Sequence, residues 1–354
     1  MNLGIFLSPG ESINSMKKTG QDARFVELYL KNYAKSFDKI YIFSYEDENP
    51  KLPKNILIVP NKTSLPRLLY ALLLPIINKE SIEKCDVIRG FGLASSISAL
   101  FVKTPFVLNW AYDYISAVRI DKKFWYIPLY HLLEKIAFLK AKKVFIATNE
   151  KFKKIKGKKF IYLPNGVDIN LFKRKKGMGS GAVFVGRFEK QKNLFFLIEA
   201  VSKLPKKLRA ITFVGHGSQK EQLKRYAIEK GIELKIMSPV SNLELPKLLQ
   251  NFSILTLSSH FEGSPKILLE AMALGLVPIA TNFSTAKEII KNGHNGYIIP
   301  YNINTYSKQL EFLLTNKTQI SRISQNAQKS IVQDFDLGNL IAKEINILKE
   351  AAKS

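Results

Sequence analysis

The sequence predicts an α/β protein of two domains, each built on a doubly wound parallel sheet. Three observations support this fold class. Short, continuously apolar runs recur along the chain, and runs of that kind are typical of strands buried on both faces of a parallel sheet. Helical segments separate them, which indicates repeated βαβ units. The 354 residues suffice for two domains of ordinary size.

The apolar runs divide into two sets along the chain. The first set contains residues 3–8, 39–45, 55–60, 86–91, 106–110, 143–148 and 160–164. The second set contains residues 182–187, 210–215, 233–238, 253–259, 277–281 and 296–300. Helical patterns occupy, for example, residues 22–37, 193–204 and 218–231, and the chain beyond Pro300 is helical in pattern to its end.

A polar segment between the two sets predicts the domain boundary. Residues 168–181 read DINLFKRKKGMGSG, a run of charge followed by glycine and serine, which is typical of a linker. We therefore predict an N-terminal domain over 1–172 and a C-terminal domain over 178–335. The last helix, about 336–354, is expected to pack back on the first domain.

The composition is that of an ordinary globular protein, with 46% hydrophobic and 23% charged residues and a net charge of +25. The excess is uneven: residues 1–177 hold 31 Lys and Arg against 15 Asp and Glu. Such a surplus indicates attraction to nucleic acid, to an anionic membrane or to phosphorylated ligands, unless the lysines are merely solvated. Aromatic residues do not alternate with the basic runs, which disfavours nucleic acid.

Other features of the sequence concern the compartment. Cys85 is the single cysteine, so no intrachain disulfide can form, which fits a reducing compartment. The N-terminus lacks the basic segment of a signal peptide. The longest apolar stretch, 68–77, is shorter than the ~20 residues of a membrane span. We expect a cytoplasmic protein, soluble or peripheral at the cytoplasmic face of a membrane.

Ligands of open α/β sheets bind beyond the carboxyl ends of the strands, so the strand-to-helix junctions of the second half are candidate sites. In FVGRFEKQKN, 184–193, Arg187 and Lys192 precede a helix and could hold an anion. Two solvated cations in a loop would give the same sequence pattern. In FVGHGS, 213–218, Gly215 and Gly217 could let the backbone approach a ligand, although a tight turn would also use them.

The segment SSHFEGSPKILLEAMALGLVPIATN contains a third junction and two unexpected carboxylates. Ser264 is a candidate helix cap and Pro265 fits a first helical position, so the N–H groups of Ser264, Lys266 and Ile267 would face an anion. Glu262 precedes this helix. Glu270 lies among leucines and alanines, which predicts a buried or cleft-facing position rather than a solvated one.

The sequence resembles the retaining glycosyltransferases of family 4, within the glycosyl transferases group 1. The resemblance rests on the E-x7-E motif in EGSPKILLEAMALG and on four further segments. They are FVGRFEKQKN, VGHGS, YLPNGVDINLF (162–172) and NGHNGYIIP (292–300). These motifs occur in the family's order and cover about 160–300. The resemblance implies the GT-B architecture, in which two Rossmann-like domains face a cleft.

The resemblance also implies a site for a nucleotide-diphosphate sugar in the second domain. Glu270 would bind the ribose hydroxyls and Glu262 the transferred sugar. Arg187 and Lys192 would neutralise the diphosphate, with help from the backbone N–H groups of the loop and helix start. That loop and helix start comprise Gly263, Ser264, Pro265, Lys266 and Ile267, and the stretch near Met237 and Ser238 would border the base. Neither metal nor cofactor is implied, since the donor is itself a substrate.

The resemblance is weaker in the first half. Within KKTGQDARFVELYL, 17–30, Gly20 would face the donor phosphates or the acceptor. In FVLNWAYDY, 106–114, Asp113 matches a family aspartate, whereas Trp110 stands where relatives carry histidine. Asp113 is thus a candidate catalytic residue, with a cap or turn as the alternative.

The basic first half suggests a glycan or lipid-linked acceptor and an anionic membrane surface as partners. Residues 65–77, flanked by Arg67 and Lys79, and the lysines of 140–159 are candidate membrane contacts, with a core helix as the alternative for 65–77. Two rival functions remain at this point: a nucleotide-sugar epimerase or hydrolase of the same fold, and a basic nucleic-acid-binding protein.

Overall fold

The computed structural model describes residues 1–18, 20–22, 24–111, 114–120, 122–175 and 177–353. The chain divides into two compact units, residues 1–164 with 338–354 and residues 165–337. Residues 165–172, which the sequence assigned to the first domain, lie in the second unit, because Val167 and Phe172 are buried in its core.

Unit 1 contains a seven-stranded parallel sheet in the order β3-β2-β1-β4-β5-β6-β7. Its strands are β1 Asn2–Phe6, β2 Lys39–Phe43, β3 Ile56–Val59, β4 Val87–Phe91, β5 Phe106–Trp110, β6 Lys143–Ile146 and β7 Phe160–Tyr162. Its main helices are α1 Ile13–Lys18, η1 Arg24–Leu30, α2 Lys31–Ala34, α3 Arg67–Ile77, α4 Lys79–Glu83, α5 Ser96–Ala99, α6 Tyr114–Ile120, α7 Ile127–Lys140 and α8 Asn149–Lys154. The short turns η2 Leu93–Ser95 and η3 Phe124–Tyr126 precede α5 and α7.

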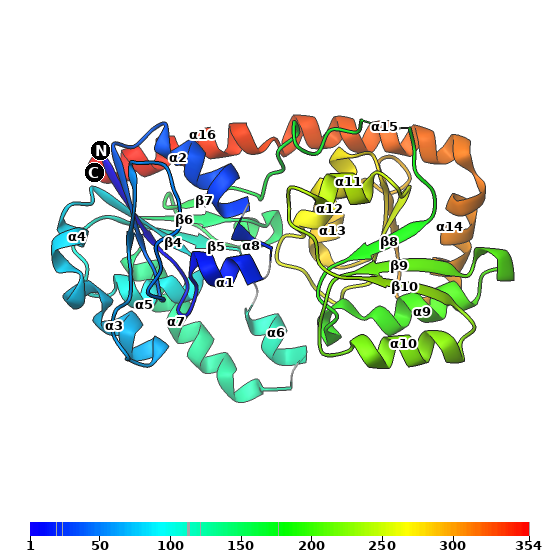
Figure 1. Cartoon of the computed structure of the whole chain (residues 1–354), viewed down its shortest axis with the longest axis horizontal. Coiled ribbons are helices and arrows are strands. Elements are labelled where there is room, and N and C mark those ends of the chain that lie inside the picture. Colours follow the sequence, from blue (N-terminus) through cyan, green and yellow to red (C-terminus); the bar gives the residue numbers. More distant parts are fainter. Residues whose placement is uncertain (19, 23, 112–113, 121, 176, 354) are drawn as a thin grey trace. The chain divides into compact units, whose positions relative to one another are not determined.

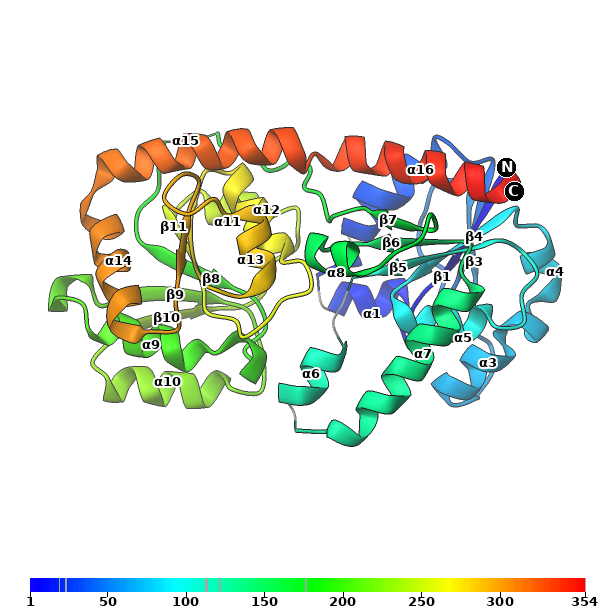
Figure 2. The same ribbon diagram turned by 180° about the vertical axis from the view of Figure 1, so that it is seen from behind.

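Helices cover both faces of this sheet. Figures 1 and 2 show α3, α5 and α7 on one side and α2 with the C-terminal helix α16, Leu337–Lys353, on the other. A buried ion pair between Arg89 of β4 and Glu344 of α16 anchors that last helix. The two ends of the chain therefore meet in one unit.

Unit 2 contains a six-stranded parallel sheet in the order β10-β9-β8-β11-β12-β13. Its strands are β8 Ala182–Val185, β9 Ala210–Val214, β10 Glu233–Met237, β11 Ile254–Leu257, β12 Val277–Thr281 and β13 Tyr297–Ile299. Its helices are α9 Leu194–Ser202, α10 Lys220–Glu229, α11 Leu245–Leu249, α12 Lys266–Ala273, α13 Ser284–Ile289, α14 Ile303–Thr315 and α15 Lys317–Asp334, with short turns η4 Lys190–Lys192 and η5 Lys206–Leu208.

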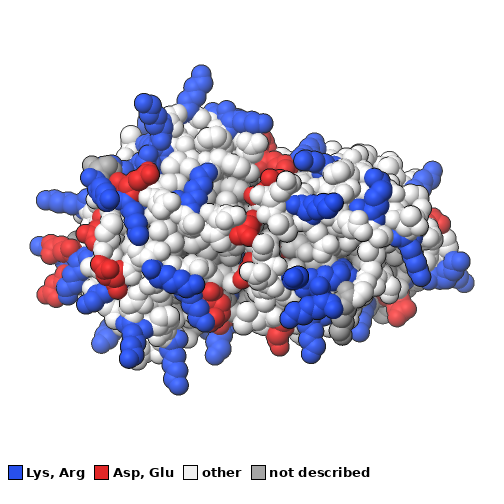
Figure 3. Space-filling model, turned by 90° about the horizontal axis from the view of Figure 1, so that it is seen from above, with Lys and Arg blue, Asp and Glu red and all other residues white. Residues whose placement is uncertain are grey.

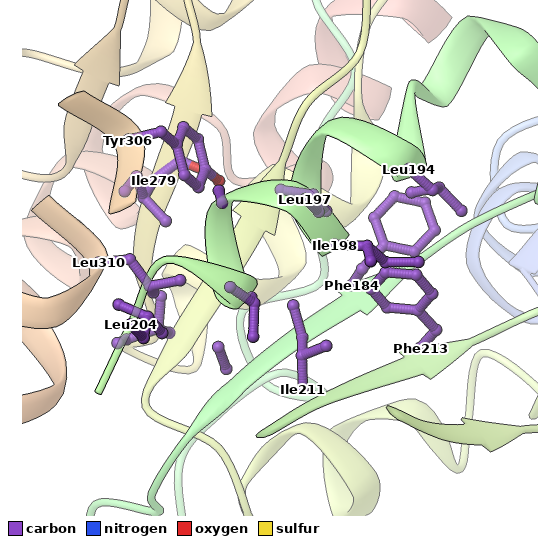
Figure 4. Close-up of a cluster of buried hydrophobic side chains, with 14 of the residues drawn as sticks. Phe184, Leu194, Leu197, Ile198, Leu204, Ile211, Phe213, Ile279, Tyr306 and Leu310 are labelled. Atoms are coloured by element: carbon purple, nitrogen blue, oxygen red, sulfur yellow. The ribbon is translucent and has the colours of Figure 1, made fainter. Parts of the chain in front are cut away.

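Side chains of unit 2 alternate between two apolar clusters, one on each face of the sheet. Figure 4 shows the first cluster, where Phe184 and Phe213 from neighbouring strands pack with Leu197 and Ile198 of α9. On the other face, Val183 packs with α11, α12, α13 and α15. Burial on both faces explains why these strands are continuously apolar in sequence.

All thirteen predicted strands are present, and the predicted doubly wound α/β fold is confirmed for both units. The predicted linker is not a free linker. Arg174 donates from Nε to the carbonyl of Leu274, and the N–H of Ser180 donates to the carbonyl of Asn251. Residues of 168–181 are thus hydrogen-bonded to the body of unit 2.

Basic side chains do not gather in one place on the face drawn in Figure 3. Lysine and arginine side chains stand singly or in small groups over that face, with acidic side chains among them. On this face, the excess of Lys and Arg is therefore distributed as separate positive charges and not as one basic patch.

Candidate functional site in the C-terminal unit

The strand order of unit 2 brings two predicted loops together. The order reverses between β8 and β11, which are hydrogen-bonded neighbours. The loop after β8 carries Arg187 and Lys192, and the loop after β11 carries Glu262 and Gly263. Both loops follow the carboxyl ends of adjacent parallel strands, which is where such sheets bind their ligands.

Lys192 and Glu262 form an ion pair between these loops. The Lys192 Nζ lies 2.5 Å from the Glu262 Oε1, although 70 residues separate them in sequence. The side chains are 15% and 9% exposed. The hydroxyl of Ser259 donates to the same carboxylate oxygen at 2.6 Å. One cation and one anion of the predicted site therefore hold each other in a sheltered position.

Neighbouring strands fix the backbone of the β11 loop. The carbonyl of Ser259 accepts hydrogen bonds from the hydroxyls of Tyr301 and of Thr281, the latter at 3.1 Å. The hydroxyl of Thr285 donates to the carbonyl of Glu262 at 3.2 Å. Sequence reasoning missed these residues, although Thr281 ends β12, Tyr301 follows β13 and Thr285 lies in the first turn of α13, all near the carboxyl edge of the sheet.

Gln191 joins the two loops a second time. Its side-chain amide donates to the carbonyl of Phe261 at 2.9 Å, and its own carbonyl accepts from the N–H of His260 at 2.9 Å. Burial lowers the pKa of His260, which favours its neutral form. The reciprocal bonds hold the β8 loop and the β11 loop in one register, and they place Glu262 beside Lys192.

Helix α12 begins one residue later than predicted. Its first helical residue is Lys266 and its N-cap is Pro265, with no side-chain cap, so Ser264 does not cap the helix as expected. Ser264 instead accepts a hydrogen bond at its carbonyl from the side-chain amide of Asn165, at 3.2 Å. Gly263 and Pro265 are buried, and Ile267 is half-buried. The positive end of the helix dipole nevertheless follows the Glu262 loop directly.

Glu270 is buried, as its apolar neighbours predicted, with 4% of its surface exposed. The side-chain amide of Asn242 donates to the Glu270 Oε1 at 3.1 Å. Asn242 is also 4% exposed, and among the described residues its Oδ1 has no hydrogen-bond partner. Asn242 was not predicted. It comes from the loop before α11, 28 residues away, and no sequence signal linked it to the helix.

Arg187 is exposed just after β8, and no contact with Lys192 or Glu262 is seen among the described residues. Its neighbour Glu189 accepts hydrogen bonds from the N–H and the hydroxyl of Ser218, at 3.0 and 2.8 Å. The backbone N–H of Ser218 is the main reason that the pKa of Glu189 lies below its usual value, and the nearby Arg187 adds to it. The loops after β8 and β9 are thereby tied together.

The glycines of the β9 loop permit contact between protein loops. A Cβ on Gly215 would lie 1.9 Å from the carbonyl oxygen of Gly186, and one on Gly217 would lie 2.4 Å from that of Phe188. The close approach that the sequence suggested is therefore to the backbone of the neighbouring loop. Met237 ends β10, half-buried, and its carbonyl accepts from the N–H of Gly215. Ser238 follows it and is exposed.

The candidate residues of unit 1 have mainly local partners. Gly20, with φ of +69°, ends α1: its N–H donates to the carbonyl of Lys17, and the next N–H donates to the carbonyl of Met16. A left-handed cap of this kind usually carries a glycine, so the fold gives Gly20 a structural reason of its own, and its predicted contact with donor or acceptor stays a prediction. Asp113 lies outside the described residues. Trp110 is buried, and its indole N–H donates to Glu134 at 3.2 Å.

The described residues include no group of three His, Cys, Asp or Glu side chains that could hold a metal ion. Within the same residues, no helix is both long and apolar enough to cross a membrane.

The part of the chain that carries the candidate site also matches a known protein family. Residues 171–330 match the family described as "Glycosyl transferases group 1". Over 85% of the chain and 81% of the other protein, the sequence is 25% identical to an Escherichia coli protein named UDP-Gal:alpha-D-GlcNAc-diphosphoundecaprenol alpha-1,3-galactosyltransferase. The match over residues 171–330 thus supports the resemblance to the glycosyl transferases of group 1 that the sequence motifs indicated.

Another relative matches over about half of this chain. It is a Campylobacter jejuni alpha-1,4-N-acetyl-D-galactosaminyltransferase named for an undecaprenol diphosphate glycan as acceptor, 24% identical over 48% of this chain and 47% of that protein. The match thus spans about half of that protein's length.

Among solved structures, the sucrose-phosphate synthase of Thermosynechococcus elongatus superposes with a TM-score of 0.83. The superposition covers 100% of both chains at 14% identity, which confirms the GT-B fold.

Proposed function

We propose that this protein is a retaining glycosyltransferase that moves a sugar from a nucleotide-diphosphate donor to a glycan or lipid-linked acceptor. The observation that carries the proposal is the Lys192–Glu262 pair at the switch point of unit 2. It sets a phosphate-binding cation and a hydroxyl-binding carboxylate side by side, directly before the positive end of α12. A molecule with a diphosphate next to a sugar offers the two complementary groups.

The donor would lie along the carboxyl ends of the strands of unit 2. We assign the diphosphate to Lys192, Arg187 and the first-turn N–H groups of α12, near Ser264 to Ile267. The buried Glu270 carboxylate would accept hydrogen bonds from the ribose hydroxyls. Met237 and Ser238 at the end of β10 would border the base.

Donor binding would replace the contact between Lys192 and Glu262 with a contact from each of them to the donor. A sugar hydroxyl donates to a carboxylate as Ser259 does now, and a phosphate oxygen accepts from an ammonium group as Glu262 does now. Each charge would then meet a ligand group of suitable polarity, and neither would be left unpaired. The pair is therefore a preorganised receptor whose two halves separate by a small movement.

The same groups would stabilise the charge that develops during the reaction. As the bond between the anomeric carbon and the diphosphate oxygen breaks, negative charge grows on the leaving group, where Arg187, Lys192 and the helix end stabilise it. The acceptor oxygen bonds to the anomeric carbon on the face that the phosphate leaves. The acceptor proton passes to the departing diphosphate, so this scheme requires neither a protein base nor a metal ion. Asp113 remains a candidate in the other unit.

The acceptor class is supported by the names of two relatives. Both the Campylobacter and the Escherichia proteins are named for undecaprenol diphosphate-linked substrates. We propose the same class of acceptor here, used by an enzyme that is peripheral at the cytoplasmic face of a membrane. The sequence surplus of Lys and Arg suits a substrate surface rich in phosphate.

Donor binding is tested by thermal unfolding with nucleoside diphosphates. A ligand that binds the native state raises the unfolding temperature by mass action. We expect stabilisation by one of UDP, GDP and ADP and none by DNA or RNA. No response to any nucleoside diphosphate would contradict the proposal, and a response to nucleic acid alone would favour a binding protein.

Transfer is tested with a panel of UDP-, GDP- and ADP-sugars, beginning with UDP-sugars because the Escherichia relative is named for UDP-Gal. We expect Arg187→Ala and Lys192→Ala to lower turnover and Glu270→Ala to weaken donor binding. Activity should survive a chelator. Unchanged turnover in Arg187→Ala would remove its role, and epimerisation of the donor without an acceptor would favour the rival enzyme.

A further inference from the structure

Helix α3 of unit 1 exposes leucine and isoleucine where a surface helix normally carries polar residues. Leu68, Leu72 and Ile76 repeat every four residues along one stripe and are 55%, 39% and 66% exposed. The opposite side of the helix is buried in the core through Tyr70 and Leu74. One face of α3 is therefore core and the other is open, so the core-helix alternative holds for one face of residues 67–77 and the membrane contact stays a prediction for the other.

A second apolar group lies on η3 and α7. The aromatic side chains of Phe124 and Trp125 are 56% and 70% exposed. Along α7, Leu129, Leu132 and Leu139 are 57%, 54% and 75% exposed. The sequence pattern did not predict this exposed group, because the residues of α7 fit a core helix equally well.

The two groups share one face of unit 1. Helix α5 contacts both α3 and α7, and the exposed Phe101 follows it directly. Figures 1 and 2 show α3, α5 and α7 side by side on one side of the sheet, away from α16. Twelve of the nineteen exposed large hydrophobic side chains among the described residues belong to this face, and they are found on 67–77, 101 and 124–139. Monomeric proteins rarely leave so large an apolar surface uncovered.

Basic residues border the apolar face. Exposed lysines and arginines on or next to its elements are Lys62, Arg67, Lys79, Lys103, Arg119, Lys122, Lys123, Lys135 and Lys142. Of these, Lys79 has Glu83 at 3.8 Å, an exposed and therefore weak pair. Exposed leucine, aromatic side chains and lysine together are the composition of surfaces that lie in the interface of an anionic bilayer.

The lysines of 140–159 contribute less than the sequence suggested. Lys140 and Lys159 donate to the carbonyls of Val102 and Phe138 within unit 1. The ammonium group of Lys151 lies 4.2 Å from the ring of Trp110, and Lys154 pairs with Glu150. Four of the nine lysines of that run therefore have partners within unit 1.

We propose that this face, formed by α3, η3 and α7 with Phe101, docks unit 1 on an anionic lipid surface. A second copy of the chain fits less well, because a two-fold contact would press the same lysines against one another. Lipid phosphates instead neutralise them, and the acyl region accepts the leucines. The inference deepens the proposed function, since a lipid-linked acceptor lies in a membrane, but its residues are all in unit 1.

Flotation with vesicles tests the docking. The parent chain should bind vesicles made of equal parts phosphatidylglycerol and phosphatidylcholine at low salt. Binding should weaken as salt rises to about 1 M, where charges are screened beyond ~3 Å. Leu132→Ser with Leu139→Ser should weaken binding by about tenfold or more. The matched control is Val332→Ser with Ile228→Ser in unit 2, at 51% and 78% exposure, which should bind like the parent.

Tryptophan fluorescence gives an independent reading. The chain has two tryptophans, of which Trp110 is 8% exposed and Trp125 is 70% exposed. Vesicles should shift the emission to shorter wavelength, and brominated lipid should quench it. Trp125→Phe should abolish both signals while flotation persists.

Three results would overturn the inference. They are failure of the parent to float at low salt, equal flotation of the leucine variant and its control, and a parent dimer that the leucine variant alone disrupts. Stabilisation by nucleoside diphosphate is measured on the same samples. If it persists while flotation fails, the docking face is wrong and the proposed function stands. The reverse result removes the proposed function and leaves the docking face.

Discussion

Replacing Glu262 with glutamine should change stability, nucleotide binding and turnover in different directions. The substitution keeps the shape of the side chain and its acceptor for the Ser259 hydroxyl, but it removes the negative charge beside Lys192. Exposed ion pairs contribute about 0–1 kcal/mol, and breaking fully buried pairs costs about 3–5 kcal/mol. With side chains 9% and 15% exposed, we expect a loss of about 2 kcal/mol in the free energy of unfolding.

The same charge should matter for the ligand. Lys192 no longer has to leave a carboxylate when a phosphate binds, so the affinity for a nucleoside diphosphate without sugar should rise. The gain is limited by the energy of the pair, about 2 kcal/mol or about 30-fold. Turnover with the complete donor should fall, because the sugar loses its charged hydrogen-bond acceptor.

Urea unfolding and calorimetric titration of the nucleoside diphosphate measure these effects. Lys192→Met combined with Glu262→Gln should recover part of the lost stability, since no uncompensated charge remains. Lys190→Met, an exposed lysine of the same turn, is the control and should change neither quantity. The reasoning is refuted if Glu262→Gln unfolds at the parent's urea concentration, or if its nucleoside diphosphate affinity falls.

Three further outcomes are expected. Glu344→Ala should lower the unfolding free energy by about 3–5 kcal/mol, because it leaves the buried Arg89 charge unpaired; an unchanged melting temperature would contradict this. Asn242→Ala should weaken donor binding about tenfold or more, through loss of a hydrogen bond to the Glu270 carboxylate, whereas a purely structural asparagine would change melting alone. The pKa of Glu189 is lowered chiefly by a backbone N–H, so its contribution to stability is complete above the ordinary glutamate pKa and is lost as pH falls through the lowered value. Glu189→Gln should therefore flatten the acid side of a stability-against-pH curve, and a parent-like curve would exclude this role.

Local chemistry made the strands of this chain predictable. The run 277–280 is apolar at every position because both faces of its strand are covered, and this pattern is visible in the sequence without any knowledge of partners. The burial of Glu270 was predictable for a related reason, since its neighbours along α12 leave no polar side of the helix. Boundaries were less accurate: residues 168–181 look like a linker, yet their polar groups bond to unit 2.

By itself the sequence determined the two doubly wound units, the resemblance to a family, and the residue types from which a site could be made. Only the tertiary structure decided which of them meet. Lys192 reaches Glu262 across 70 residues, and Asn242 reaches Glu270 across 28, because the order of strands sets neighbouring loops side by side. The open apolar face of unit 1 was decided in the same way. An apolar residue in a helix pattern is equally suited to a core or to a membrane, and only the packing of α3 and α7 against the sheet determines which side remains uncovered.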